Sequence, residues 1–266
     1  MIIGGTSVFD NDWYPEFCYS ASRREDIFKN FKRHPVYTRV VEYFSPEVGQ
    51  KCFEHIIKNR SIELDENDWL FFLQNDLIGN PLIAEYNFDG QKVIGSPTTL
   101  RYIKVLIDII SLFDVSKIKT VTEIGIGYGG QCRVLINALP IERYNLIDLP
   151  EVLALTEKFL TALNQTGDLR YIDGTHLYHD APCDLFISDY AFSELAKPVQ
   201  DMYIEKVLSK AKAGYVTWDG DFFASYGMYN GYTLEEFVSM IPDAKIFPEY
   251  PETTSPDNRL VVWGIK

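Results

Sequence analysis

The sequence predicts an α/β protein in which a mostly parallel β-sheet carries helices on both faces. After about residue 95, short β-rich runs alternate with helical patterns, which is typical of parallel strands joined by helices. A glycine-rich turn joins the first of these strands directly to a helix. The last two strand-like runs have only a loop between them, which predicts an antiparallel pair at the sheet edge. We therefore expect a mostly helical N-terminal region of residues 1–95 and an α/β domain of residues 96–266.

The first region shows helical spacing interrupted by turn residues. Ser45-Pro46 is typical of a helix start, because serine caps free N–H groups and proline fits the first turn. Asp89-Gly90 predicts a hairpin turn. The expected helices cover residues 23–31, 35–44, 45–57 and 65–74, and the expected hairpin strands cover residues 84–88 and 92–94.

The second region is more regular. Ser96-Pro97 begins a helix that should run through Leu112. The expected strands then cover residues 120–124, 144–147, 169–172, 184–188, 215–218, 244–247 and 260–264. The expected helices between them cover residues 130–138, 150–163, 193–211 and 233–240.

Composition narrows the class of protein. The chain has 266 residues, a formal net charge of -13 and a pI of about 4.8, so a phosphate backbone is repelled and nucleic acid is excluded as a partner. The apolar stretch 102–113 contains Lys104 and Asp108 and is too short to span a bilayer. Four scattered cysteines and an N-terminus without a secretion signal predict a cytoplasmic protein with reduced thiols. The sequence does not decide whether the protein is a monomer or a homo-oligomer.

The glycine-rich turn is the strongest sign of a binding site. Gly125, Gly127 and Gly130 spell G-x-G-x-x-G after a strand and before a helix, where a ligand approaches the backbone at the carboxyl edge of the sheet. Asp148 follows Gly127 by 21 residues, where an acid would hold a ribose diol. This spacing serves a nicotinamide dinucleotide and S-adenosylmethionine equally, because both carry an adenosine ribose.

Three features favour S-adenosylmethionine. Glu123 stands two residues before the first glycine, where a carboxylate suits an ammonium and a sulfonium but repels a pyrophosphate. Asp173 follows the third strand, where it would accept a hydrogen bond from the adenine amino group. The sheet also closes with an antiparallel pair. The expected cofactor contacts are Glu123, Gly125, Gly127, Asp148, Leu149, Asp173, Gly174 and Ser188.

These residues resemble a known family. E-x-G-x-G-x-G after a strand, with an acid after the next strand, resembles the class I S-adenosylmethionine-dependent methyltransferases. That resemblance implies a Rossmann-like seven-stranded methyltransferase sheet with its last strand inserted antiparallel, and S-adenosylhomocysteine as product.

A narrower resemblance rests on four motifs in order. It joins residues 75–81 (NDLIGNP), 96–102 (SPTTLRY), 121–130 (VTEIGIGYGG) and 188–195 (SDYAFSEL). Together these motifs resemble the sugar O-methyltransferase family associated with decorated polysaccharides and glycosylated natural products. This implies methyl transfer to a hydroxyl of a small sugar substrate, either nucleotide-linked or part of a polysaccharide or glycoside. The particular sugar does not carry over.

A sugar hydroxyl needs a base, or a metal that acidifies it, before it attacks a methyl group. Asp189 at the end of the fourth strand is the first candidate base, and Glu194 is the second. Glu194 also fits a helix start, where it would only complement the dipole. Tyr190 is the third catalytic candidate. Its ring, like that of Tyr226, could bind sugar faces or hydroxyls.

Further acids and amides are expected at the acceptor. Asp219 and Asp221 end the fifth strand at the same edge of the sheet. Asp189, Asp219 and Asp221 could jointly hold Mg²⁺ through oxygen ligands, an alternative that we do not favour over a metal-free site. The turn at residues 75–81 would act as a lid. The expected substrate contacts are Asn75, Asp76, Asn80, Asp219, Asp221 and Tyr226.

Two other classes of function remain. One is an NAD-dependent nucleotide-sugar oxidoreductase, because the glycine spacing also fits that cofactor. The other is a non-catalytic binding protein that keeps the methyltransferase fold. A titration with S-adenosylhomocysteine and with NADH distinguishes the oxidoreductase from a methyltransferase.

Overall fold

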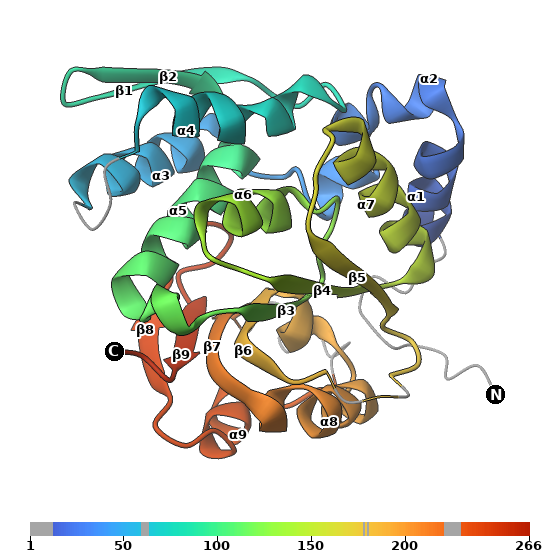
Figure 1. Cartoon of the computed structure of the whole chain (residues 1–266), viewed down its shortest axis with the longest axis vertical. Helices are drawn as coiled ribbons and strands as arrows, with labels where there is room; N and C mark the ends of the chain where they lie inside the picture. The colour runs from blue at the N-terminus through green and yellow to red at the C-terminus, as the bar shows by residue number, and fades with distance from the viewer. Residues whose placement is uncertain (1–12, 60–63, 178, 180, 221–229) are drawn as a thin grey trace.

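The sheet lies at the centre of the molecule in the computed structural model (Figure 1). The structure describes residues 13–59, 64–177, 179, 181–220 and 230–266. Two residues of the expected acceptor site, Asp221 and Tyr226, lie outside the described residues.

Seven strands form the sheet in the order β5-β4-β3-β6-β7-β9-β8. Their bounds are β3 Thr120–Ile124, β4 Arg143–Asp148, β5 Asp168–Asp173, β6 Cys183–Asp189, β7 Ala211–Trp218, β8 Lys245–Pro248 and β9 Arg259–Trp263. The strands from β3 to β7 pair in parallel, whereas β9 is antiparallel to both β7 and β8. This confirms the predicted Rossmann-like sheet with its last strand inserted antiparallel.

Helices cover both faces of the sheet (Figure 1). The helices α5 Pro97–Leu112, α6 Gly130–Ala138 and α7 Pro150–Ala162 lie on one face, and α8 Lys197–Lys206 and α9 Leu234–Ser239 lie on the other. A separate apolar cluster fills each side: Val121 and Leu146 belong to the first, and Phe186 and Val216 belong to the second. Burial of both faces accounts for the apolar run Leu185, Phe186 and Ile187 at the centre of β6.

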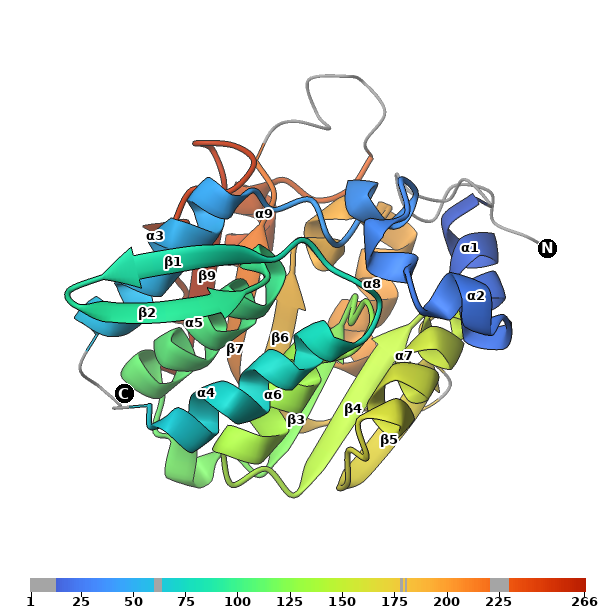
Figure 2. The same cartoon turned by 90° about the horizontal axis from the view of Figure 1, so that it is seen from above.

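The N-terminal region packs over the first face, against α5 and α7 (Figure 2). Its elements are α1 Trp13–Arg23, α2 Glu25–Phe28, α3 Pro46–Lys58, α4 Glu66–Phe72 and the hairpin of β1 Ala84–Phe88 and β2 Gln91–Gly95. The expected caps are present, since the Ser45 hydroxyl accepts a hydrogen bond from the Val48 N–H at 3.4 Å. The apolar side chains of this region share one cluster with those of α5 to α7, as Phe53 and Ile103 illustrate.

One predicted helix was wrong, and another is confirmed only in part. Residues 35–44 form only a short 3₁₀ turn, η2 Tyr37–Arg39, followed by irregular backbone that lines the central cavity. Four β-branched residues, Val36, Thr38, Val40 and Val41, weaken the helix there. The predicted helix 193–211 is broken up because Pro198 sets the start of α8, and its last residue, Ala211, begins β7.

Candidate cofactor and acceptor site

A cavity of about 520 Å³ opens at the carboxyl ends of β3, β4, β6 and β7. Parallel sheets of this order bind ligands at this edge. The N-terminal region supplies the opposite wall, so the cavity lies between the two parts of the chain. Its polar and aromatic lining comprises Tyr14, Arg39, Tyr43, Phe44, Arg101, Tyr102, Glu123, Asp148, Thr175, Asp189, Tyr190, Glu194, Tyr203, Asp219, Thr254 and Ser255.

The glycine turn forms the floor of this cavity. Gly125 and Gly127 have φ values of 71° and 54°, in the left-handed region that favours glycine. A Cβ on Gly125 would lie 2.1 Å from the Cβ of Ala191, so no larger residue fits there. Two backbone N–H groups of the turn are used inside the protein: Gly125 donates to the carbonyl of Ile147 at 3.1 Å, and Gly129 donates to that of Ile126 at 2.9 Å.

Asp148 ends β4 beside the glycine turn and lines the cavity. One carboxylate oxygen accepts from the Leu149 N–H at 2.8 Å, and the other accepts from the Gly127 N–H at 3.3 Å. Each oxygen keeps a second lone pair for a ligand. Burial raises the pKa of Asp148 to about 7. Leu149 and Gly174 line the cavity next to it.

Glu123 also lines the cavity, but both of its oxygens have partners inside the protein. The Gln131 amide donates to one at 3.1 Å, and the Tyr144 hydroxyl donates to the other in a short hydrogen bond. Burial raises the pKa of Glu123 to about 8, so its neutral form dominates at pH 7. The structure therefore does not present Glu123 as the free carboxylate that the sequence suggested.

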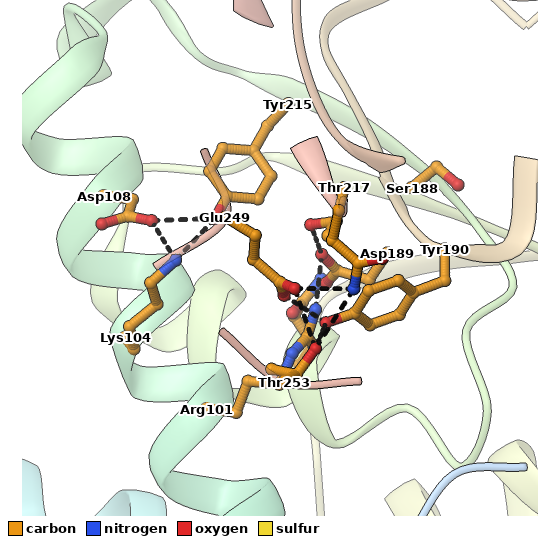
Figure 3. Close-up of polar contacts among 12 residues, drawn as sticks. Arg101, Lys104, Asp108, Ser188, Asp189, Tyr190, Tyr215, Thr217, Glu249 and Thr253 are labelled. Atoms are coloured by element: carbon orange, nitrogen blue, oxygen red, sulfur yellow. Dashed lines mark hydrogen bonds and ion pairs between the residues drawn. The ribbon is translucent and has the colours of Figure 1, made fainter. Parts of the chain in front are cut away.

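Asp189 ends β6 and forms a buried ion pair with Arg101 of α5, with 2.9 Å between Oδ1 and Nη2 (Figure 3). The Thr217 hydroxyl donates to the same Oδ1 at 2.8 Å. The other oxygen, Oδ2, is buried and has no hydrogen-bond partner among the described residues. The Arg101 guanidinium lies 5.2 Å from the ring centre of Phe44 and 4.9 Å from that of Tyr190.

Glu194 and Asp219 form a second acidic group on the cavity wall. Ser193 links the turn before Glu194 to the end of β7, because its hydroxyl donates to the Tyr190 carbonyl at 2.6 Å and accepts from the Asp219 N–H at 3.0 Å. Burial, with a smaller contribution from the charge of Asp219, raises the pKa of Glu194 to about 8. Burial, followed by the charge of Glu249, raises the pKa of Asp219 to about 6.

The Tyr190 ring lines the cavity, but its hydroxyl is engaged elsewhere. That hydroxyl donates to Glu249 and lies 2.8 Å from the hydroxyl oxygen of Thr253, in the loop between β8 and β9 (Figure 3). Tyr190 therefore contributes the face of its ring to the cavity and holds this loop in place.

The expected lid residues do not line the cavity. Asn75 is fully buried, and its amide donates to the Gly130 carbonyl at 3.0 Å. Asp76 accepts from the N–H and the hydroxyl of Ser96, each at 2.7 Å, and thereby caps α5. The Asn80 amide donates to a side chain of the N-terminal region at 3.0 Å. Asn75 and Asp76 thus connect the two parts of the chain, whereas Asn80 bonds within the N-terminal region. The structure does not place the three residues in the cavity lining.

Two expected cofactor contacts are also absent from the cavity lining. Asp173 is exposed and accepts from the N–H and the hydroxyl of Thr175 at 2.8 and 2.6 Å. Ser188 is buried, and its hydroxyl accepts from the Phe192 N–H at 2.9 Å. Ser188 thus supports the turn that carries Tyr190 and Glu194 rather than facing a ligand.

Sequence reasoning assigned no role to Arg101, although it lines the cavity. A signal was present, since Arg101 stands between Leu100 and Tyr102 in an apolar helix, and buried cations need partners. Tyr43 and Phe44 were missed because the segment that carries them was expected to be helical.

The described part of the chain contains no group of three or more side chains suited to a metal ion. Of the three aspartates considered for Mg²⁺, Asp189 and Asp219 line the cavity and Asp221 lies outside the described residues. Magnesium binding is therefore untested. Within the same described residues, no helix is long and apolar enough to cross a bilayer.

No family model and no curated protein sequence match the chain. Solved structures match part of it. The mitomycin 7-O-methyltransferase MmcR is 13% identical over 61% of this chain and 56% of its own, with a TM-score of 0.43. An S-adenosylmethionine-dependent methyltransferase from Clostridium acetobutylicum ATCC 824 is 10% identical over 62% of this chain and 89% of its own, with a TM-score of 0.45. The structure described as PigF with SAH is 13% identical over 84% of this chain and 71% of its own, with a TM-score of 0.43.

The match thus spans little more than half the length of MmcR. At these identities a likeness concerns the fold alone, so the function has to be argued from the cavity.

Proposed function

We propose that this chain is an S-adenosylmethionine-dependent methyltransferase that methylates a hydroxyl group. The observation that carries the proposal is the acidic lining of the cavity. Five carboxyl groups and two guanidinium groups line it, namely Glu123, Asp148, Asp189, Glu194 and Asp219 against Arg39 and Arg101. Burial favours the protonated forms of Glu123, Asp148 and Glu194, and a ligand that carries a sulfonium and an ammonium would favour their ionised forms.

The glycine turn argues against a dinucleotide. A pyrophosphate binds to free N–H groups at a glycine turn and helix N-terminus. Here the N–H groups of Gly125 and Gly129 are bonded to carbonyl oxygens, and that of Gly127 donates to the Asp148 carboxylate. A carboxylate therefore takes the donor that a phosphate oxygen would need. This disfavours the NAD-dependent oxidoreductase.

The same residues fit S-adenosylmethionine. Asp148 keeps a free lone pair on each oxygen for the two ribose hydroxyls. Leu149 and Gly174 line the cavity on the adenosine side, and Gly125 and Gly127 let the ligand approach the backbone. S-adenosylmethionine supplies an electrophilic methyl group, and S-adenosylhomocysteine is the product.

Glu194 is the proposed base for the acceptor hydroxyl. Its carboxyl group faces the cavity, and its pKa of about 8 lies close to physiological pH, as proton transfer requires. The proton of the acceptor hydroxyl passes to Glu194, with Asp219 beside it. Asp189, the first candidate from the sequence, is less suited because Arg101 and the Thr217 hydroxyl already occupy one of its oxygens. The presence of such a base also disfavours a non-catalytic binding protein.

The acceptor side of the cavity is compatible with a sugar. We place the acceptor against residues 39–44 of the N-terminal region, where the rings of Tyr43 and Phe44 offer flat faces to sugar C–H groups. Thr254 and Ser255 add hydroxyl groups. The Arg39 side chain is exposed on the same wall, where it would meet the phosphate of a nucleotide-linked sugar.

Calorimetric titration of the full chain with S-adenosylhomocysteine and with NADH tests the proposed cofactor. We expect S-adenosylhomocysteine to bind and NADH not to bind. Asp148→Ala should weaken S-adenosylhomocysteine at least about tenfold, or about 1.4 kcal/mol, because the ribose loses a charged acceptor. Asp173→Ala is the matched control and should leave affinity unchanged, since Asp173 does not line the cavity.

Tighter binding of NADH than of S-adenosylhomocysteine would sink the proposal. For the acceptor, nucleotide sugars are incubated with S-adenosylmethionine, and mass spectrometry looks for the gain of one methyl group. The same assay with phenols and aliphatic alcohols compares methyl transfer to sugars with methyl transfer to other hydroxyl acceptors.

A further inference from the structure

Arg101 and Asp189 place a positive and a negative charge side by side in the cavity wall (Figure 3). Their side chains are only 6% and 10% exposed. Taking two charges out of water costs free energy that a single ion pair often fails to recover. Because this buried pair lines a cavity, a bound ligand could supply the hydrogen bonds that the pair lacks.

Each partner has hydrogen-bonding capacity left over. Oδ1 of Asp189 is shared by Arg101 and Thr217, whereas Oδ2 is buried without a partner in the described part of the chain. An unsatisfied buried carboxylate oxygen costs free energy until a donor reaches it. Arg101 has five N–H donors, and Asp189 is the partner that the structure gives it. Among the described residues, the pair thus leaves one carboxylate oxygen without a donor.

The position of the pair relative to Asp148 matters. In the sheet, Ile124 at the end of β3 is level with Ser188 of β6, so Asp189 lies beside the glycine turn that begins at Gly125. Asp148 lies on the other side of the same turn, at the end of β4. A cofactor whose ribose is held at Asp148 directs its other end across the turn toward Asp189.

We propose that Arg101 and Asp189 bind the amino-acid end of the cofactor, with Arg101 on the α-carboxylate and the Asp189 carboxylate on the α-ammonium. This inference rests on the proposed function. A zwitterion complements the ion pair charge for charge, and the planar guanidinium suits a carboxylate geometrically. The rings of Phe44 and Tyr190 flank the guanidinium and hold it in place.

This assignment gives two neighbouring acids, Asp189 and Glu194, different roles. Asp189 becomes a cofactor-binding residue, and Glu194 keeps the role of base. It also gives residues 1–95 a part in cofactor binding, because Phe44 lies against Arg101.

The test compares two ligands that differ only at the amino-acid end. S-adenosylhomocysteine carries that end, and 5′-deoxy-5′-methylthioadenosine has the same adenosine and thioether without it. Calorimetry on the full chain should show that Arg101→Gln weakens S-adenosylhomocysteine at least about tenfold and the thioadenosine less than about twofold. Asp189→Asn should do the same. Asp148→Ala, the matched control, should weaken both ligands alike.

Equal losses for the two ligands in Arg101→Gln would overturn the inference, because the pair would then only support the fold. Unchanged affinity for S-adenosylhomocysteine would overturn it as well. If the unaltered chain binds neither ligand, the proposed function fails together with this inference. Thermal unfolding of each variant monitors folding, and Arg101→Lys, which keeps the charge, replaces Arg101→Gln if that variant does not fold.

Discussion

At the scale of single residues, the environment separates acids of the same chemical type. Asp189 has an arginine partner, whereas Glu194 has a second carboxyl group nearby. Burial, together with this second carboxyl group, favours the protonated form of Glu194. The chain therefore holds an ion-paired acid and an acid of raised pKa within a few residues of the end of β6.

Glu194→Gln should lower kcat by about 100-fold or more, in the range expected for loss of a general base. The affinity for S-adenosylhomocysteine should stay within about twofold, because the proposed role of Glu194 is toward the acceptor and not the cofactor. In the unaltered chain, kcat/KM should rise with pH through about 8 and then level off, because the pKa of Glu194 is raised and the base form exists above it. Steady-state kinetics across pH 6 to 9 measures both.

Asp189→Asn serves as the comparison. It should raise the dissociation constant for the cofactor and keep the rise of kcat/KM with pH. Near-normal turnover by Glu194→Gln would remove Glu194 from the role of base.

At the scale of elements, α5 is the part that positions the site. Three of its residues, Arg101, Lys104 and Asp108, face the strands (Figure 3). Asp108 Oδ2 lies 2.6 Å from Lys104 Nζ and accepts from the Tyr215 hydroxyl of β7 at 2.8 Å. These contacts anchor the helix to the sheet one to two turns beyond Arg101.

The other end of α5 depends on Asp76. Its carboxylate accepts from the N–H and hydroxyl of Ser96 and from the hydroxyl of Thr99, each at 2.7 Å. Asp76→Ala should lower the free energy of unfolding by about 2–3 kcal/mol, because it leaves the donors of Ser96 and Thr99 at a buried helix start without a partner. Urea denaturation measures this loss. Glu157→Ala, at an exposed position on α7, is the control and should change stability by less than about 0.5 kcal/mol.

Variant Asp76→Ala should still bind S-adenosylhomocysteine once it is folded, since Asp76 does not line the cavity. A large loss of affinity without a loss of stability would instead return Asp76 to the ligand site.

At the scale of the whole molecule, the carboxyl groups of the cavity make the stability of the fold depend on pH. The pKa values of Glu123, Asp148, Glu194 and Asp219 are raised to about 8, 7, 8 and 6 by burial, from ordinary values of 4.5 for Glu and 3.8 for Asp. Between the ordinary and the raised values, the folded chain binds more protons than the unfolded chain. The stability that these groups contribute is complete below the ordinary pKa values and is lost as pH rises through the raised ones.

The cofactor-free chain should therefore lose stability from pH 6 to pH 8. Each group protonated only in the folded state contributes about 1.4 kcal/mol per pH unit. Urea denaturation at pH 6, 7 and 8 measures the free energy of unfolding. S-adenosylmethionine should reduce the dependence, because its positive charges favour the ionised carboxylates. Glu123→Gln, which removes one fully buried group, should also reduce it. A rise in stability over this range contradicts the prediction.

Strand and helix positions followed from local patterns where those patterns were unambiguous. The predicted bounds of β3 and α6 agree with the structure because an apolar strand, a glycine turn and a helix follow one another without interruption. The prediction of a helix at 35–44 was wrong. Pro35 and the spacing of apolar residues favoured a helix, but the β-branched residues disfavour it, and the segment instead lines the cavity as irregular backbone.

The sequence by itself determined the sheet, the glycine turn and the acid at Asp148, because each depends on neighbours in the chain. Only the tertiary structure decided which acids stay charged. Arg101 and Asp189 meet across α5 and β6, Glu123 is neutralised by burial, and Asp76 caps a helix instead of touching a ligand. Charge state and accessibility depend on desolvation and on partners far away in the chain, and those exist only once the chain has folded.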